Sequence, residues 1–424
     1  MKTKTILFIG LAAFFFACQS NSHLPTVNGG DEAPDLIPRQ DIVLTSVEQQ
    51  LSKQTNTFAF NLFKTVYAGE KENHQNILLS PLSATLALSM LNNGAAGTTW
   101  EEIQQTLGYG NTSQEEVNSY AQKIMNAMQT IDSRGVFESA NSMWIQKDFS
   151  VLNAFKQVNQ QYYDAEIRNV DFNQSATVQT INNWVNNKTH GKIPKIFENI
   201  PSLTRLILCN ALYFKGYWTT PFAKELTTDA VFHAATGSEQ MTPTMRNTLN
   251  SCLYTKMDNC AALELPFGNE AFGLVVILPD ENTDISEIVS RMDGDWWMQV
   301  VKNLEGSSNN YKVNLEIPRF KLEYERTLND DLIALGMQTP FSAKEADLSL
   351  ISQDSLFVSE VKQKTFAQMN EDGMEAAAVT SINSTSSSSF EYTPVNFKVN
   401  RPFLYFIKEK STGLVVFAGV MNSI

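Results

Sequence analysis

The sequence is poor in the residues from which catalytic and metal centres are built. Its 424 residues include four histidines and four cysteines. The spacings typical of zinc proteases, dithiol redox sites, serine hydrolases and phosphate-binding loops do not occur, namely H-E-x-x-H, C-x-x-C, G-x-S-x-G and G-x-x-x-x-G-K-[ST]. We therefore expect no metal site, no cofactor and no enzymatic activity.

Basic residues are outnumbered by acidic ones. The chain has 32 Lys and Arg residues against 45 Asp and Glu residues, and its formal net charge is -13. An acidic surface repels polyanions, so we expect neither nucleic acid nor an anionic membrane surface as a partner. The short basic cluster of Lys188, His190, Lys192 and Lys195 is typical of a solvated loop.

Cysteines are too few for a disulfide framework. Cys209 lies in an apolar run, residues 206–210, and is expected to be a buried strand residue. Cys252 and Cys260 could pair across a hairpin or could both remain free thiols, because their spacing alone does not fix the geometry. If Cys18 is excluded, three cysteines remain, and this odd number leaves at least one thiol unpaired.

The hydrophobic run at the N-terminus is too short to cross a membrane. It covers residues 6–17, whereas a spanning helix needs roughly 20 apolar residues. Lys2 and Lys4 precede it and Cys18 follows, which is typical of an export signal and resembles a bacterial lipoprotein signal. We expect residues 1–17 to be a signal peptide, Cys18 to be lipidated and residues 18–45 to be a flexible tether. A plain signal peptide is the alternative, because Phe15 stands where lipoprotein signals prefer Leu. Without Lys2 and Lys4 the net charge falls to -15.

The rest of the chain mixes helical and strand periodicity, and its length alone would allow one large domain or about two to three smaller ones. Helical patterns come early and strand patterns late, which favours an α+β architecture. Helices are expected at residues 57–67, 82–91, 100–107, 111–132 and 178–188, the second of them capped by Ser80 with Pro81 in its first turn. Strands are expected at residues 205–214, 261–266, 273–278, 311–320, 356–368, 403–407 and 414–421.

One segment near the C-terminus has an unusual composition. Residues 371–380 (EDGMEAAAVT) pass from an acidic corner with a glycine into three alanines and β-branched residues. A serine-rich tract without core-forming periodicity follows, over residues 381–389. By propensity alone residues 371–380 could form an ordinary helix. The same small residues also suit a strand that is exposed at first and buried later.

Motifs along the chain decide between these readings because they resemble the serpins. The resemblance covers roughly residues 46–424 and includes NILLSPLS (76–83), MLNNG (90–94), INNWV (181–185), THGKI (189–193), NALYFKGYWTTPF (210–222), ELPF (264–267), LPDE (278–281), IPRF (317–320), LGM (335–337), ADLS (346–349), RPF (401–403) and FAG (417–419). It implies a large central, mostly antiparallel sheet with further sheets. It also implies about eight or nine helices and an exposed reactive loop at about residues 371–395.

The resemblance implies an inhibitor that traps serine proteases covalently as a suicide substrate, by inserting its loop into the main sheet. The hinge of that loop maps onto Glu371, Gly373, Met374, Glu375, Ala376, Ala377, Ala378 and Thr380. Strand alternation puts Met374, Ala376, Ala378 and Thr380 on the inward face, and Glu375 and Ala377 on the face toward solvent. No charge or proline falls on the inward face, although Met374 stands where the family prefers Thr or Ser.

The bond to be cleaved is less sharply defined. Counting forward from the hinge gives Ser387 and Ser388, whereas counting back from Arg401 gives Glu391. Ser386 and Phe390 are further candidates, and the loop is about four residues longer than the family norm. Small residues suit elastase-like or subtilisin-like proteases, and Phe390 suits a chymotrypsin-like one.

Other family positions complete the expectation. The polar cluster that is called the shutter in serpins maps onto Ser80, Ser83, Asn210 and Gln363. At the position of Gln363 a histidine is commoner in the family. The region called the breach maps onto Trp218. Residues 111–132 lack a basic stripe, so no heparin-like activation is expected. We expect a monomer in the outer membrane, at the cell surface or in the periplasm, which contacts membrane only through its lipid. A non-inhibitory serpin, acting as a binding module or as a protease substrate, is the alternative.

Overall fold

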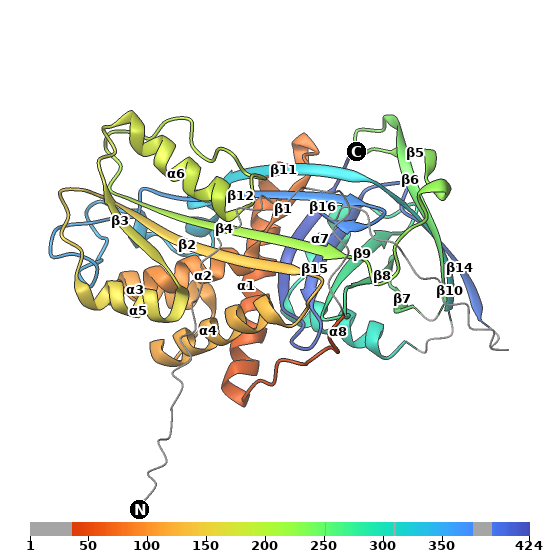
Figure 1. Ribbon diagram of the computed structural model, residues 1–424, viewed down its shortest axis with the longest axis horizontal. Coiled ribbons are helices and arrows are strands. Elements are labelled where there is room, and N and C mark those ends of the chain that lie inside the picture. The colour runs from red at the N-terminus through yellow and green to blue at the C-terminus, as the bar shows by residue number, and fades with distance from the viewer. Residues whose placement is uncertain (1–35, 251, 308–310, 376–391) are drawn as a thin grey trace, which may run out of the picture.

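The computed structural model describes residues 36–250, 252–307, 311–375 and 392–424 (Figure 1). These residues form nine α-helices and three β-sheets. The helices are α1 (Ser46–Glu70), α2 (Pro81–Asn92), α3 (Gly97–Leu107), α4 (Gln114–Thr130), α5 (Asn153–Tyr163), α6 (Ser175–Lys188), α7 (Ile285–Arg291), α8 (Gly294–Glu305) and α9 (Asn329–Ala334). The expected α+β class is confirmed.

The central sheet has six strands in the order β11-β12-β13-β4-β2-β3. Their bounds are β11 (Phe320–Thr327), β12 (Glu360–Asn370), β13 (Gly373–Met374), β4 (Leu206–Tyr217), β2 (Val136–Gln146) and β3 (Glu166–Val170). β12 and β4 pair in parallel where Glu360–Lys362 meet Ile207–Cys209. At the other end of the two strands the short β13 lies between them and is antiparallel to both.

Two further sheets lie toward one end of the molecule (Figure 1). One has the order β1-β16-β15-β9-β8-β7 and the other β14-β10-β6-β5. Their bounds are β1 (Ile77–Leu79), β16 (Val415–Met421), β15 (Phe403–Glu409), β9 (Phe272–Pro279), β8 (Cys260–Phe267), β7 (Tyr254–Met257), β14 (Thr393–Lys398), β10 (Tyr311–Pro318), β6 (Glu239–Asn250) and β5 (Thr228–His233). The chain therefore leaves the central sheet after β13 and resumes in a different sheet at β14.

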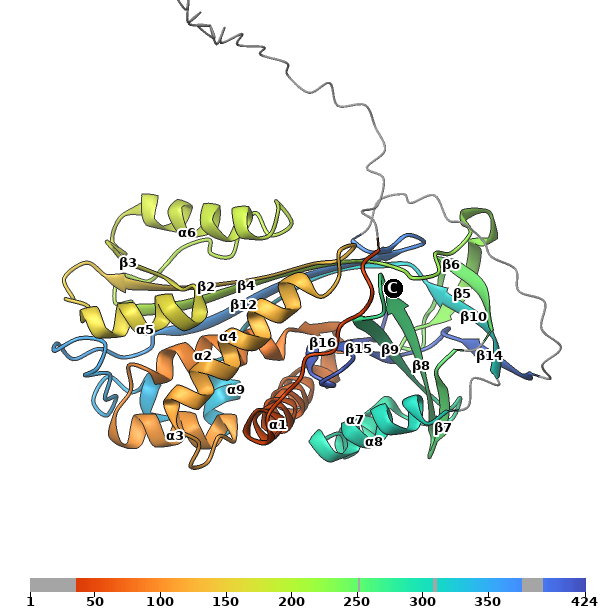
Figure 2. The same cartoon turned by 60° about the horizontal axis from the view of Figure 1, so that its bottom comes forward.

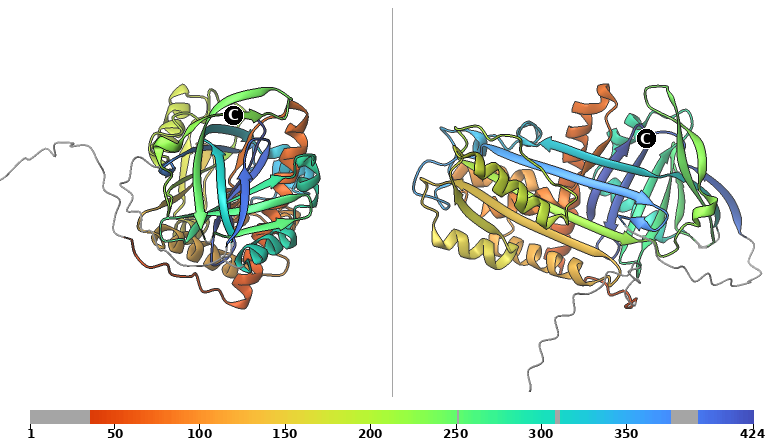
Figure 3. Two further views of the ribbon diagram at one scale, coloured as in Figure 1. Left: turned by 90° about the vertical axis from the view of Figure 1, so that its right-hand side faces the viewer. Right: turned by 45° about the horizontal axis from the view of Figure 1, so that its top comes forward.

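Helices cover the central sheet unequally. With the sheet seen nearly edge-on, α6 lies alone on one face, whereas α2, α3, α4, α5 and α9 gather on the other (Figure 2). With the top of the molecule turned forward, α6 lies in front of the central strands (Figure 3, right). Under α6 a small cluster includes Trp144 of β2, Trp184 of α6 and Cys209 of β4. α6 therefore covers only part of this face of the central sheet. No described helix lies over the rest of the face (Figure 2).

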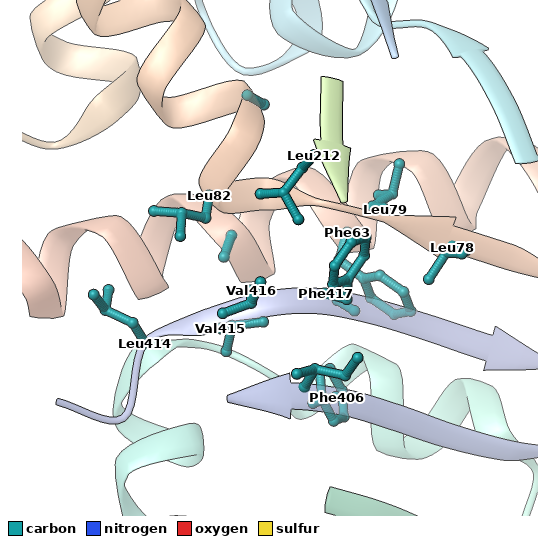
Figure 4. Close-up of a cluster of buried hydrophobic side chains, with 14 of the residues drawn as sticks. Phe63, Leu78, Leu79, Leu82, Leu212, Phe406, Leu414, Val415, Val416 and Phe417 are labelled. Carbon is teal, nitrogen blue, oxygen red and sulfur yellow. The ribbon is translucent and has the colours of Figure 1, made fainter. Parts of the chain in front are cut away.

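The main core joins the helical layer to the sheets. Phe63 of α1, Leu82 of α2 and Leu212 of β4 converge on Phe406 and Phe417 of β15 and β16 (Figure 4). These side chains are all at least nine-tenths buried. Removing such apolar surface from water is the dominant favourable contribution to folding. The core therefore joins the helical layer to β4, β15 and β16.

Several local predictions can be compared with the structure. The Ser80 hydroxyl accepts from the N–H of Ser83 and Pro81 opens α2, so the predicted cap is confirmed. The single strand expected at 311–320 is wrong, because the chain turns at Arg319 and divides it between β10 and β11. The Arg319 N–H donates to the carbonyl of Pro243 at 2.9 Å, which fixes this corner. The expected order of helices first and strands later holds only loosely, since β2 and β3 lie among the early helices and α7–α9 among the late strands.

The cysteine question is settled by strand register. Cys209, Cys252 and Cys260 are free thiols. Cys260 pairs with Met257 across the β7–β8 hairpin, and Tyr254 pairs with Leu263, so Cys252 lies beyond the pairs and away from Cys260. Burial raises the pKa of the Cys252 and Cys260 thiols to about 11. Both are therefore protonated and unreactive near neutral pH.

The described end of the N-terminal segment follows the surface of the body. The Ile37 N–H donates to Ser133 Oγ at 3.1 Å, and the Ile42 N–H donates to Ser411 Oγ at 2.9 Å. The side chain of Ile42 is buried. In the described ranges no helix combines the length and the apolar character needed to cross a bilayer.

Candidate functional site

The candidate site is the place where β13 lies between β12 and β4. Gly373 pairs with Asn370 and Tyr217, and Met374 pairs with Met369 and Gly216. Beyond Met374 the facing edges of β12 and β4 diverge, and they pair directly again only at Lys362 and Cys209. The central sheet therefore contains a gap with a very short strand at its open end.

Gly373 is required by close backbone contact. Its φ is +151°, and a Cβ there would lie 2.0 Å from the carbonyl oxygen of Gly216 and 2.8 Å from the Cα of Tyr217. A side chain could not be accommodated without moving β4, since both obstacles are backbone atoms. Gly373 thus lets the chain enter between two strands at this point.

Met374 is already part of the sheet. Its side chain is 2% exposed and lines a small apolar cavity together with Leu78, Phe214, Phe366, Ala367, Tyr405, Ile407 and Phe417. An unbranched thioether adapts well to such an irregular space. The residue expected to be the first on the inward face of the hinge is thus found in the core.

Glu371 and Asp372 anchor the turn that precedes β13. The Glu371 carboxylate accepts hydrogen bonds from Arg319 Nε at 2.7 Å and from Thr227 Oγ1 at 2.5 Å. Burial acts to raise the pKa of Glu371, but these hydrogen bonds outweigh it and hold the pKa below its usual value. Asp372 pairs with Lys224 at 3.2 Å. The turn is therefore fixed to the segment that precedes β5 and to the corner between β10 and β11.

Trp218 covers the same end of the gap. Its ring stacks on Phe267 with centroids 4.6 Å apart, and its Nε1 donates to the carbonyl of Asn370 at 2.8 Å. Its backbone N–H donates to the carbonyl of Asp372 at 3.0 Å. Trp218 therefore joins β4 to the corner between β12 and β13.

A buried polar cluster lies at the other end of the gap. The Ser80 N–H donates to Gln363 Oε1 at 2.9 Å, and Gln363 Nε2 donates to the Ser80 carbonyl at 2.8 Å. Ser83 Oγ donates to Asn210 Oδ1, and Asn210 Nδ2 donates to Asn141 Oδ1 at 2.5 Å. The cluster connects α2 to β12, β4 and β2, and it lies where β12 and β4 come together again.

Comparison with known proteins identifies the family. The profile of the serpins (serine protease inhibitors) matches residues 53–424. The leukocyte elastase inhibitor of Homo sapiens is 34% identical over 387 residues, which cover 88% of this chain and 100% of that protein.

The chain belongs to the serpin family. A serpin-like protein of Thermococcus kodakarensis is 30% identical over 99% of both chains. The crystal structure of tengpin, a thermophilic serpin, in the native state gives a TM-score of 0.80 at 31% identity and covers 93% of this chain and 100% of that chain. The latent state of tengpin gives a TM-score of 0.75 at 29% identity, covering 91% and 100%.

The structure brings together the residues expected to form the shutter, and Trp218, the residue expected at the breach, lies between β4 and the corner from β12 to β13. Ser80, Ser83, Asn210 and Gln363 are all buried and belong to one hydrogen-bonded cluster. Part of the hinge, from Glu371 to Glu375, is described. Ala376, Ala377, Ala378 and Thr380 lie outside the described residues, as do the candidate cleavage positions Ser386, Ser387, Ser388, Phe390 and Glu391.

One expectation about the serpin hinge is wrong. Glu375 was expected to point toward solvent, but its side chain is 2% exposed. Its φ of +56° turns the chain out of strand conformation, and its carboxylate lies 3.6 Å from Lys192 Nζ. Strand alternation predicts the face on which the Glu375 side chain lies, but it does not predict which residues pack against it. Those residues come from the segment after α6 and from β4.

Several residues that contact the hinge or the shutter were not assigned to the site from the sequence, and Lys192 was expected in a solvated loop. Arg319, Lys224 and Lys192 pair with the carboxylates of Glu371, Asp372 and Glu375, respectively. Asn141 is hydrogen-bonded to Asn210 of the shutter, and Thr365 lies two residues after Gln363 on β12. Thr365 Oγ1 donates to the carbonyl of Leu78 at 2.6 Å. The alternation within β12 was a usable signal for Thr365, because it shares the inward face with Gln363. In the described parts of the chain no group of His, Cys, Asp or Glu residues could hold a metal ion.

Proposed function

We propose that this serpin inhibits serine proteases by trapping them as suicide substrates. The observation that carries the proposal is the short strand β13, which is seated at the mouth of a gap between two strands. A protease would cleave the exposed loop and form an acyl bond to it. The hinge would then extend β13 into the gap, and the tethered protease would be displaced before the acyl bond is hydrolysed.

The register of β13 defines where the following residues would go. Gly373 and Met374 pair with Tyr217 and Gly216 on one side, and with Asn370 and Met369 on the other. If the same register continues, the position of Ala378 falls between Leu212 and Thr365, and that of Thr380 falls between Asn210 and Gln363. The gap thus ends at the shutter cluster, beyond which the Lys362–Cys209 pairing would have to open.

The composition of the hinge supports this extension. The inward positions after Met374 carry alanine and threonine, and none carries a charge or a proline. Each added residue would satisfy backbone groups on both diverging edges, where unpaired groups are unfavourable. In the intact protein these backbone hydrogen bonds would therefore remain unformed, and they would form only after the loop is cut.

The loop sequence supports a target with a small or moderately apolar specificity pocket. Residues 385–391 contain serines, one threonine, Phe390 and Glu391, and no Lys or Arg. The relative named leukocyte elastase inhibitor is similar over the whole of its length. We therefore favour elastase-like or subtilisin-like targets, with a chymotrypsin-like protease as the second choice through Phe390.

Incubation with an elastase-type serine protease tests the function. We expect a covalent complex that survives SDS and boiling, together with loss of protease activity. A non-inhibitory serpin that serves as a binding module or a simple substrate would give only cleaved chain and active protease. If every serine protease tried leaves only that cleaved product, the inhibitory function is wrong.

We also propose that the chain is exported and anchored through a lipid on Cys18. The basic start, the short apolar run and the position of Cys18 support this proposal. The full-length protein should fractionate with membranes, and Cys18→Ala should release it. Unchanged fractionation of Cys18→Ala, with no lipid in the intact mass of the wild type, would contradict the anchor and leave the inhibitory function unaffected.

A further inference from the structure

Glu375 marks the point at which the strand stops extending. Its backbone N–H donates to the Gln368 carbonyl at 2.7 Å, which continues the β13–β12 ladder by one residue. No corresponding pair is formed with β4 after Met374 and Gly216. At Glu375 φ becomes +56°, a left-handed conformation that is unfavourable for a residue with a Cβ. Something other than backbone preference must hold the chain in this turn.

The side chain of Glu375 is held from two directions. Its Oε2 atom lies 3.6 Å from Nζ of Lys192, which belongs to the segment between α6 and β4. Tyr213 and Lys215, both on β4, are the other neighbours whose polar groups act on the pKa of this carboxyl. Beside Tyr213, the ring of His190 lies 4.6 Å away and is itself bonded to Glu138 at 2.8 Å. We call Glu375, Lys192 and Tyr213 the hinge clasp.

The hinge clasp occupies the path of the strand. In the register of β13, Glu375 belongs level with Lys215 and Gln368, and the next outward position belongs level with Tyr213 and Phe366. The carboxylate instead reaches down to Tyr213 and to Lys192, whose ammonium also lies 5.2 Å from the centre of the Phe366 ring. An advancing strand would therefore need the place that the Glu375 side chain now fills.

We propose that Lys192 and Tyr213 are positioning residues that arrest the hinge after Met374 by holding the Glu375 carboxylate. Breaking this contact is then a required step of insertion, and its strength sets the insertion rate. The inference rests on the proposed function for its biological meaning. The contact itself is a property of the uncleaved protein and can be tested without a protease.

Substitutions of Lys192 and of Glu375 are expected to have opposite effects on the stability of the arrested conformation. Burial raises the pKa of Glu375, and Lys192, Tyr213 and Lys215 offset this only in part. Loss of the Lys192 ammonium leaves a buried carboxylate with less compensation, which loosens the clasp. Replacement of Glu375 by glutamine removes the buried charge and keeps the shape, which tightens the arrested conformation.

Hydrogen exchange at the Glu375 amide, in intact protein without protease, is the direct test. We expect Lys192→Met to speed this exchange at least ~10-fold and Lys192→Arg to restore slow exchange. Glu375→Gln should exchange no faster than wild type, and it should suppress the effect of Lys192→Met in the double variant. Lys195→Met is the matched control, because Lys195 lies in the same segment but pairs only with the exposed Glu198 at 2.8 Å among the described acidic residues.

The double variant separates the clasp from a general effect on the segment that carries Lys192. If the Glu375 amide exchanges at the same rate in Lys192→Met as in Lys195→Met, the proposed role of the hinge clasp is wrong. The same holds if Glu375→Gln does not suppress the faster exchange caused by Lys192→Met. Complex formation with an elastase-type protease is measured on the same variants. Faster amide exchange without any SDS-stable complex would support the clasp while rejecting the inhibitory function, so the two failures are distinguishable.

Discussion

The side-chain amide of Gln363 forms a two-point hydrogen-bonded pair with the backbone of Ser80. Its Oε1 accepts from the Ser80 N–H at 2.9 Å, and its Nε2 donates to the Ser80 carbonyl at 2.8 Å. Both residues are almost wholly buried, and the pair joins the start of α2 to the centre of β12. Unlike an imidazole, an amide does not titrate, so this junction keeps its hydrogen bonds across the physiological pH range.

Gln363→His should therefore introduce a pH dependence that the wild type lacks at this position. A buried neutral imidazole resists protonation, so its folded-state pKa falls below the ordinary value of about 6.5. The stability contributed by that neutral group is present above the ordinary pKa and is lost as the pH falls through that region. Thermal midpoints of variant and wild type between about pH 5 and 8 measure it. Parallel profiles for the two proteins would contradict the prediction.

Acidification should slow spontaneous insertion of the intact wild type. Because burial raises the pKa of Glu375, the protonated carboxyl is favoured in the arrested conformation, and this favourable contribution is lost as the pH rises through the raised pKa. The effect belongs to the pH range just above the ordinary carboxyl value. Conversion of heated, uncleaved protein to a form that resists urea measures the rate. Glu375→Gln should show no such dependence on pH, and an equal dependence in both proteins would assign the titration to another group.

Cleavage of the loop within residues 384–391 should raise the thermal midpoint sharply. The cut frees the hinge to extend β13 along the diverging edges of β12 and β4, which adds backbone pairing and apolar burial. Differential scanning calorimetry of intact and cleaved protein measures the change. A cleaved protein that melts together with the intact one would show that no strand is added.

Ala378→Arg should convert the inhibitor into a substrate. In the continued register this position lies between Leu212 and Thr365 on the core face, where an unpaired guanidinium would cost several kcal/mol. Insertion would slow while acylation, which occurs nearer to Ser387, would continue. The ratio of SDS-stable complex to cleaved chain should therefore fall by more than about tenfold.

Ala377→Arg is the matched control for that variant, since position 377 faces away from the core. It should reduce the ratio much less, because an arginine on that face does not enter the apolar core. Equal losses from both substitutions would show that the assumed alternation does not extend beyond Met374. Glu375→Arg is not a suitable control, because the wild-type side chain is buried in the hinge clasp.

Much of this protein could be inferred from its sequence because the relevant information is local. The Ser80-Pro81 pair fixed the start of α2, since capping depends on the adjacent turn alone. The ordered motifs gave the family, and alternation from Met374 gave the inward face. The break at Arg319 was missed because the apolar pattern of residues 311–320 runs through it, and only the contact with Pro243 shows where the two strands separate.

The state of the hinge was decided by tertiary structure. Met374 is buried because it packs with Leu78, Phe214 and Phe417, from three other strands, around one small apolar cavity. Glu375 is buried because Lys192 and Tyr213 approach it from segments more than 150 residues earlier in the chain. Alternation specifies which face a side chain takes, but solvent exposure depends on what packs against that face. For this protein the sequence by itself determined the family and the inward face of Met374, whereas the packing of β4 and of the segment after α6 decided that Glu375 is buried.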